Sequence, residues 1–202
     1  MKKMAILSMT AALFIVSSFG PAPHGAPAAK CGLYLTTGDF MKSRLSYATD
    51  VTSATKHTIK IHEGLFGSAT VDLVYDGKKQ VFSLDQVYGY RDAKGQDFRF
   101  FGRQTYRIED TAGFYLYTAT KLVQGMKISR SQTLYFFSVK PDDNVEALTL
   151  ANLESAYPGN PRFRYGLEAL AGHFRGDLEL SDYDDALKTY KIKYLYAQSL
   201  QQ

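Results

Sequence analysis

The strongest constraint on the fold is a long region, from residue 32 to about residue 140, in which helical periodicity is hard to find. It consists of short runs of apolar, aromatic and β-branched residues separated by Gly, Asp and Lys, which is the pattern of β-strands and turns. We expect about nine or ten strands from this pattern. They cover residues 33–35, 45–47, 58–61, 69–75, 81–84, 87–90, 98–101, 105–109, 113–118 and 134–139.

These strands are short, closely spaced and not separated by the crossover helices that parallel pairing requires. They therefore predict an antiparallel meander. The expected fold class is α+β, mainly β, with a body at residues 30–140 that is either a sandwich or a partly closed barrel.

The clearest local prediction is a hairpin around Asp76-Gly77. Every second residue from 69 to 75 is apolar, so this run is expected to have one buried face. Asp-Gly tolerates the positive φ values of a two-residue turn, and the run at 81–84 would return antiparallel. Lys94-Gly95 and Gly102-Arg103 are two further predicted turns.

The pattern changes near Pro141, and residues 141–202 are expected to form a helical segment of the same domain. A short helix should follow Thr149 and end before Pro158, and a second should span residues 163–171. A third should begin at Ser181 as N-cap, because aspartates fill its first turn and lysines follow, as the helix dipole favours. Its apolar stripe, expected to pack on the β body, is Tyr183, Leu187, Tyr190 and Tyr194.

The N-terminus has the features of a secretory signal peptide. Lys2 and Lys3 precede an uncharged stretch at residues 4–19, which is short for a membrane span, and a Pro/Ala-rich region follows at residues 20–29. We therefore expect residues 1–29 to be a signal peptide with its cleavage region, cut after Ala28 or Ala29. The mature protein would reach the periplasm or the extracellular medium and keep no stable membrane span.

Removal of the leader leaves a nearly balanced charge. The whole chain has 24 Lys and Arg against 20 Asp and Glu, so the loss of Lys2 and Lys3 leaves 22 against 20. A nucleic-acid partner is not expected, because it requires a concentrated basic face. Basic and aromatic residues do alternate at residues 88–103, as in some single-strand binders. We interpret that segment as cross-strand packing with exposed arginines.

Cys31 is the single cysteine of the chain. In an oxidising compartment it could form a disulfide with another chain or remain a free thiol. The preferred interpretation is a small apolar residue at the start of the first strand, and Lys30 immediately before it disfavours lipidation. A nucleophilic role is not expected, because the residue would lie at a frayed mature terminus.

Recognisable catalytic and metal-binding motifs are missing from the sequence. His57 and His62 are five residues apart, which places them on opposite faces of a strand. Nucleophile elbow, phosphate loop and zinc spacings are not found either. We therefore expect no cofactor, no metal and no catalytic residue.

Aromatic residues are the most distinctive positive feature, with 15 Tyr and 13 Phe. In residues 113–117 and 134–139 both strand faces are apolar or aromatic, so both must be covered. The C-terminal helix would cover one face. The alternative is an aromatic binding surface for a small apolar molecule, a glycan or a protein partner. Its candidate residues are Tyr115, Tyr117, Tyr135, Phe137, Tyr190 and Tyr194.

Several segments resemble uncharacterised exported proteins of the Bacteroidota. They are Cys31-Gly32-Leu33-Tyr34-Leu35, Gly89-Tyr90-Arg91-Asp92, the run from Thr111 to Tyr117, the run from Leu148 to Leu153, and Asn160-Pro161-Arg162-Phe163. The resemblance implies an envelope or extracellular setting and no particular activity. The sequence thus predicts a non-catalytic module that binds a ligand or protein or acts structurally, and an envelope hydrolase or other enzyme without a recognisable motif is the alternative.

Overall fold

A computed structural model describes residues 30–50, 57–63, 68–124, 129–171 and 180–201. The expected signal peptide, residues 1–29, lies outside the described residues. Strands make up 44% and helices 25% of the structure, and the sheets are antiparallel, which confirms the mainly β fold class. Within the described ranges, no helix is both long enough and apolar enough to cross a membrane.

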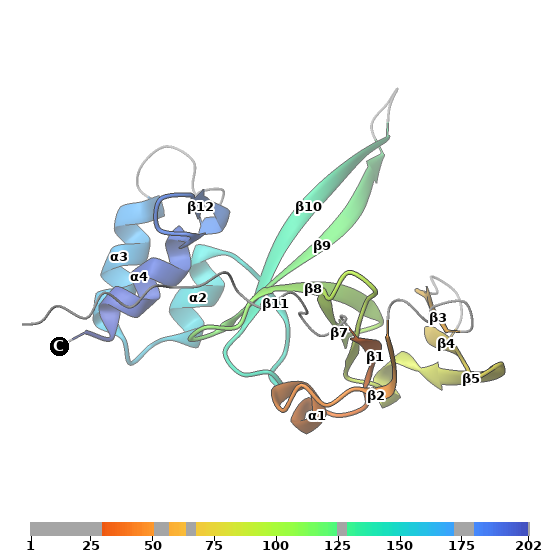
Figure 1. Cartoon of the computed structure of the whole chain (residues 1–202). Helices are drawn as coiled ribbons and strands as arrows, with labels where there is room; N and C mark the ends of the chain where they lie inside the picture. The colour runs from red at the N-terminus through yellow and green to blue at the C-terminus, as the bar shows by residue number, and fades with distance from the viewer. Residues whose placement is uncertain (1–29, 51–56, 64–67, 125–128, 172–179, 202) are drawn as a thin grey trace, which may run out of the picture.

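The large sheet has eight strands in the order β11-β10-β9-β8-β7-β6-β1-β2 (Figure 1). From β6 to β11 it is the predicted meander. Its order leaves β2 and β11 as edges, so the sheet does not close on itself. The strands are β1 (Lys30–Tyr34), β2 (Ser46–Asp50), β6 (Gly89–Arg91), β7 (Asp97–Phe101), β8 (Gln104–Asp110), β9 (Tyr115–Gln124), β10 (Ser129–Ser138) and β11 (Glu146–Ala147).

A smaller sheet contains β3 (Thr58–His62), β4 (Thr70–Tyr75) and β5 (Lys78–Ser83). The predicted turn joins β4 to β5, with φ values of 49° at Asp76 and 73° at Gly77. The predicted alternation is also confirmed, since Val71 and Leu73 are fully buried. The small sheet packs on one end of the large sheet as a local sandwich. Its core is Leu33, Ala69, Val71, Leu73, Leu84, Val87 and Phe100.

Pairing across the large sheet defines two faces. Cross-strand partners point to the same side, and neighbours along a strand point to opposite sides. Face A carries the row of paired residues Leu33, Tyr90, Phe98, Arg107, Thr118 and Tyr135. Face B carries Tyr34, Arg99, Tyr106, Tyr117 and Phe136, and it is covered by α1 (Thr37–Met41) through Phe40.

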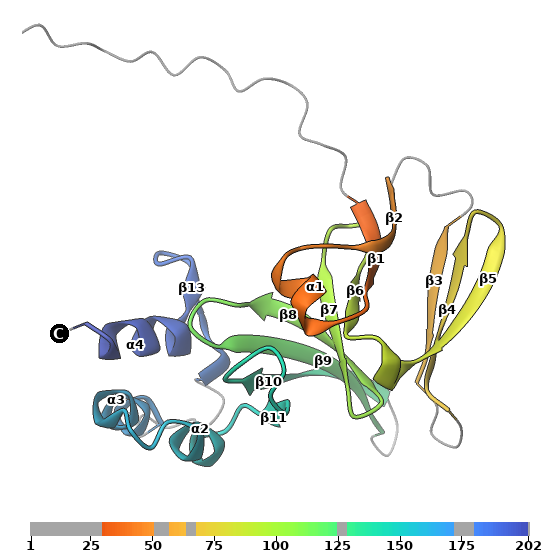
Figure 2. The same ribbon diagram turned by 90° about the horizontal axis from the view of Figure 1, so that it is seen from below.

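The C-terminal helices cover the other end of face A, opposite the small sheet (Figures 1 and 2). They are α2 (Leu150–Ala156), α3 (Pro161–Ala171) and α4 (Lys191–Ser199). Thr149 caps α2 by accepting a hydrogen bond from the backbone of Asn152, as expected. The core that they form with the sheet is Phe114, Leu116, Phe137, Leu148, Leu153, Tyr157, Phe163, Leu167, Leu180 and Ile192.

The prediction of a third helix starting at Ser181 is wrong. The segment instead forms a hairpin of β12 (Tyr183–Asp184) and β13 (Thr189–Tyr190), and α4 begins only at Lys191. The reason is local: the Asp184 side chain accepts hydrogen bonds from the backbone of Ala186 and Leu187, which closes a turn in competition with a helix. The expected apolar stripe is broken, and three of its four members, Tyr183, Leu187 and Tyr194, are exposed.

A buried lysine on α4, Lys193, forms polar contacts with the sheet. Lys193 is only 4% exposed, and its ammonium donates hydrogen bonds to the backbone oxygens of Ala112 and Phe114. An ion pair of 3.5 Å joins its Nζ to Asp110 Oδ1, and the Phe114 ring centroid lies 3.9 Å from Nζ. The last residue of β8 and the turn from β8 to β9 thus supply these contacts. Burial nevertheless lowers the pKa of Lys193 to about 8.

This lowered pKa makes stability depend on pH in a defined direction. Between the folded pKa of about 8 and the ordinary value of 10.5, the unfolded chain binds more protons than the folded chain, so stability rises with pH. We expect the wild-type protein to gain about 2 kcal/mol over the Lys193→Met variant between pH 7 and pH 9.5, measured by urea denaturation. Lys191→Met, which removes a more exposed ammonium, is the control. A difference between wild type and Lys193→Met that does not change with pH would contradict this assignment.

Candidate functional site

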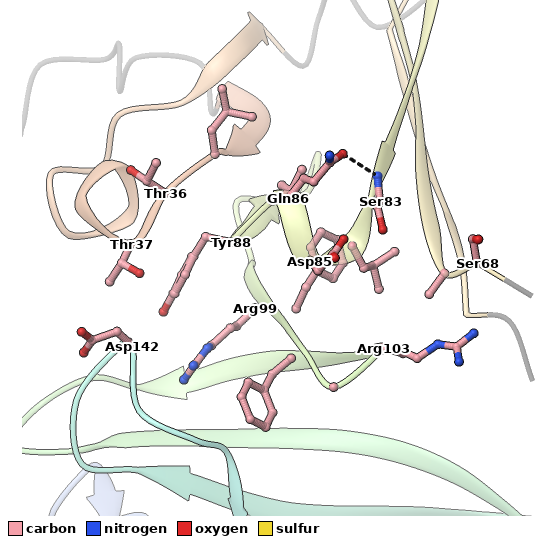
Figure 3. A pocket seen from close by; sticks show the side chains of 17 residues that line it. Thr36, Thr37, Ser68, Ser83, Asp85, Gln86, Tyr88, Arg99, Arg103 and Asp142 are labelled. Atoms are coloured by element: carbon pink, nitrogen blue, oxygen red, sulfur yellow. Dashed lines mark hydrogen bonds between the residues drawn. The ribbon is translucent and has the colours of Figure 1, made fainter.

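A cleft of about 850 Å³ lies where the small sheet, α1 and the turn between β7 and β8 meet (Figure 3). Thr36 and Thr37 line it from the start of α1. Leu84 and Val87 line it from the short helical turn η2 (Leu84–Gln86) and the residue after it. Its size falls in the range of small-molecule sites. We therefore take this cleft as the candidate site.

Arg99 is the charged residue that distinguishes the cleft. It is only 3% exposed, although it lines the cavity from β7. Three rings surround its guanidinium, with Cζ at 5.5 Å from the centroid of Tyr88, 5.4 Å from that of Phe101 and 5.7 Å from that of Tyr117. These are distances at which aromatic faces attract a cation.

The hydrogen bonds of Arg99 all go to neutral acceptors. Nη1 donates to Tyr117 Oη at 3.0 Å and to Ser138 Oγ at 3.2 Å, and Nη2 donates to the backbone oxygen of Asp143 at 2.6 Å. Nε has no hydrogen-bond partner in the described structure. The Arg99 guanidinium forms no ion pair with any carboxylate of the described residues.

Arg91, on the neighbouring strand, provides a comparison, because its guanidinium forms an ion pair with Asp97. Its Nε and Nη2 each lie 2.7 Å from an oxygen of Asp97, in the two-pronged geometry that fits a carboxylate. Arg99 lacks such a partner and is more deeply buried. A buried cation without a counter-charge is costly, so the Arg99 side of the cleft is suited to an anionic group.

Other groups complete the cleft. The hydroxyl of Tyr88 is buried, has no hydrogen-bond partner among the described residues, and lies beside Arg99 in Figure 3. Burial raises the pKa of Tyr88, so the hydroxyl stays protonated and can donate. Asp142 lines the cleft near Arg99, and Leu84, Val87 and Phe100 form an apolar wall. The cleft thus combines a buried guanidinium, with the Asp142 side chain near it, and an apolar side.

The structure divides the six aromatic residues that the sequence suggested as a binding surface. Tyr115 and Tyr117 lie on face B, and Tyr117 is fully buried with its hydroxyl on Arg99. Tyr135 and Phe137 lie on face A, where the ring of Tyr135 contacts that of Tyr190 at a centroid distance of 6.2 Å. Tyr194 is exposed on α4. The six residues therefore do not line one cavity.

The expectation of exposed arginines at residues 88–103 is wrong for Arg99. The residue alternates with Phe98 and Phe100, whose side chains point to face A, so its own side chain points into the core of face B. The available sequence signal was an arginine inside a run of three phenylalanines. Whether the Arg99 side of this strand is buried depends on which strands pair with it, and the sequence did not show that pairing.

Cys31 is not at a frayed end, contrary to expectation, because β1 lies inside the large sheet between β2 and β6. Its Sγ is 3.5 Å from His57 Nδ1, and both residues are buried. Burial raises the pKa of Cys31 and lowers that of His57, so both groups are uncharged at neutral pH. A neutral buried thiol is a poor nucleophile. A disulfide to another chain stays a prediction and would require β1 to open first.

The described residues contain no group of three or more His, Cys, Asp or Glu side chains arranged to hold a metal ion. No protein-family model, curated protein or solved structure matches this chain. A functional proposal therefore depends on the geometry of the described side chains.

The role of Arg99 can be tested first through stability. Replacing a buried charge with an apolar side chain of similar length removes the cost of desolvating that charge. We therefore expect Arg99→Met to lower the free energy of unfolding by no more than about 2 kcal/mol, since the backbone oxygen of Asp143 loses a donor while Tyr117 and Ser138 keep the 2.9 Å hydrogen bond between their own hydroxyls. Urea denaturation measures the change, with Arg91→Met, which leaves Asp97 with the Tyr34 hydroxyl but without its cation, as the destabilised comparison. A loss of about 3 kcal/mol or more in Arg99→Met would show that Arg99 serves the fold.

Proposed function

We propose that the mature chain is an exported, non-catalytic binding protein that holds a small molecule with an apolar body and one anionic group, such as a carboxylate, in the cleft beside Arg99. The observation that carries this proposal is the buried Arg99 guanidinium, which lines a cavity of about 850 Å³ without a carboxylate partner among the described residues.

The chemistry of the lining supports a ligand of this kind. A carboxylate would supply the counter-charge that Arg99 lacks, and the protonated Tyr88 hydroxyl could donate to the same group. Leu84, Val87 and Phe100 offer apolar surface to the remainder of the molecule. The lining also contains many polar side chains, Asp85 and Asp142 among them, so the proposal places the anionic group at Arg99 and the apolar body of the ligand against these three side chains.

Binding rather than catalysis fits the group that characterises the cleft. Arginine keeps its proton in proteins, so Arg99 can hold and orient an anion but cannot exchange a proton with it. Arg99 is also held rigidly, because its contacts come from β9, β10 and the backbone of residue 143. A preorganised cation of this kind lowers the ordering cost of binding.

The ligand class is tested with pairs of probes that differ only in charge. We expect the protein to bind decanoate or indole-3-acetate at least tenfold more tightly than the corresponding primary amide, because only the carboxylate neutralises Arg99. Titration calorimetry measures both members of each pair. Arg99→Met should abolish the preference, whereas Arg107→Met, an exposed arginine on face A, should leave it unchanged.

A second pair of variants tests the place of binding. Thr37→Trp introduces bulk into the cleft and should weaken both carboxylates, whereas Thr58→Trp adds the same bulk to an exposed strand position at the far end of the small sheet. Equal affinities for acids and amides in the wild-type protein, or a preference that survives Arg99→Met, would refute the proposed ligand class.

Export is tested on the protein purified from its own host. We expect the intact mass to correspond to a chain that begins at Ala29 or Lys30, because signal peptidase would cut after Ala28 or Ala29. Native mass spectrometry of the same sample, before and after denaturation, would also reveal any ligand that is carried through purification. A mass that includes residues 1–29 would contradict processing by signal peptidase.

A further inference from the structure

A second cleft, of about 420 Å³, lies on face A between the residues that the small sheet covers and those that the C-terminal helices cover. The small sheet covers face A at β1, β6 and β7, and the C-terminal helices cover it at β9 and β10. Between them, the paired row Phe98, Arg107, Thr118 and Tyr135 crosses four strands, a distance of about 14 Å. An aromatic ring therefore stands at each end of a polar floor.

The floor is rich in hydroxyl groups and is electrically balanced. Thr105, Thr118, Thr120 and Thr133 line the cleft. Arg107 Nε lies 3.2 Å from Glu109 Oε1, and the Thr118 hydroxyl donates to the same oxygen at 2.5 Å. The two charges thus neutralise each other, and nothing in this lining favours a ligand with net charge.

Two observations distinguish this floor from an ordinary solvated strip. The Glu109 side chain is only 11% exposed, although it lies on a sheet face between two covers. The Thr105 hydroxyl is buried and has no hydrogen-bond partner among the described residues. A buried polar atom without a hydrogen-bond partner is uncommon in folded proteins. Thr105 lines the cleft, so a ligand bound there could supply the partner that its hydroxyl lacks.

Two tyrosines form the side of the cleft nearest the C-terminal helices. Tyr135 comes from β10 and Tyr190 from β13, and their rings meet edge to face. Burial raises the pKa of Tyr190 to about 12, and the negative charge of Glu109 contributes to the increase. Tyr190 lines the same cleft as Glu109, and its hydroxyl is protonated under physiological conditions.

We propose that this second cleft binds a neutral sugar unit of a glycan. A sugar ring carries hydroxyls around its edge and C–H groups on its faces, so it needs both polar partners and an apolar ring surface. Arg107, Glu109 and the threonine hydroxyls supply donors and acceptors without net charge, and Tyr135, Tyr190 and Phe98 supply aromatic surface with polar tips. The proposal is independent of the cleft at Arg99, which lies on other residues.

The test uses neutral oligosaccharides on a glycan array that includes maltotriose, cellotriose, chitotriose and mannotriose, with hits confirmed by saturation-transfer NMR. We expect at least one neutral sugar to bind. The double variant Arg107→Lys, Thr120→Val should weaken that binding by about tenfold, because it removes a guanidinium and a hydroxyl from the floor while keeping a cation beside Glu109.

Two control variants show whether the sugar binds in this cleft and not elsewhere on the protein. Thr58→Val removes an equally exposed threonine hydroxyl from β3, outside the cleft, and Arg99→Met alters the other cleft, so both should bind the sugar as the wild-type protein does. A failure of the carboxylate proposal would leave these results unaffected. Absence of binding to every neutral sugar on the array would overturn the inference, and so would sugar binding that the double variant leaves unchanged.

Discussion

Antiparallel pairing register in the large sheet is the constraint on which the rest of the structure depends. Side chains alternate strictly along a strand, so pairing Phe98 with Arg107, and Arg107 with Thr118, also decides that Arg99 and Tyr117 share the opposite face. A shift of one residue would expose the aromatic core of face B and bury the polar floor of face A. The local sandwich, the helical cover and both clefts therefore follow from one register.

Features that depend on neighbouring residues were predictable from the sequence. The Asp76-Gly77 turn and the helix that Thr149 caps need only local hydrogen bonds and backbone preferences, and both form as expected. The segment after Ser181 shows the limit of the same reasoning. Asp184 can favour the start of a helix or close a turn onto the backbone of Leu187, and these two local preferences compete. Here the turn forms, and α4 starts later.

Features that depend on the order of strands in the sheet could not be predicted from the sequence. Five of the six suggested aromatic residues lie in the expected kind of element, and Tyr190 lies in a strand where a helix was expected, but only the pairing shows that Tyr117 and Tyr135 lie on opposite faces. Cys31 is similar: its position near the start of the mature chain indicated a frayed end, yet β1 is inserted between β2 and β6. The burial of Arg99 depends on the same non-local pairing, which is why an exposed arginine was expected.

Three cations, Lys193 on α4 and Arg91 and Arg99 on the sheet, differ in the partners that the chain supplies to them. Lys193 is surrounded by backbone oxygens and Asp110, and Arg91 is matched to Asp97, so the chain itself supplies their partners. Even with these contacts, burial lowers the pKa of Lys193, which shows that the site penalises charge. A lysine can relieve that penalty by losing a proton, but an arginine cannot. Arg99 must therefore stay charged in its aromatic surroundings, and an anion entering the cleft would supply the counter-charge that its neighbours do not.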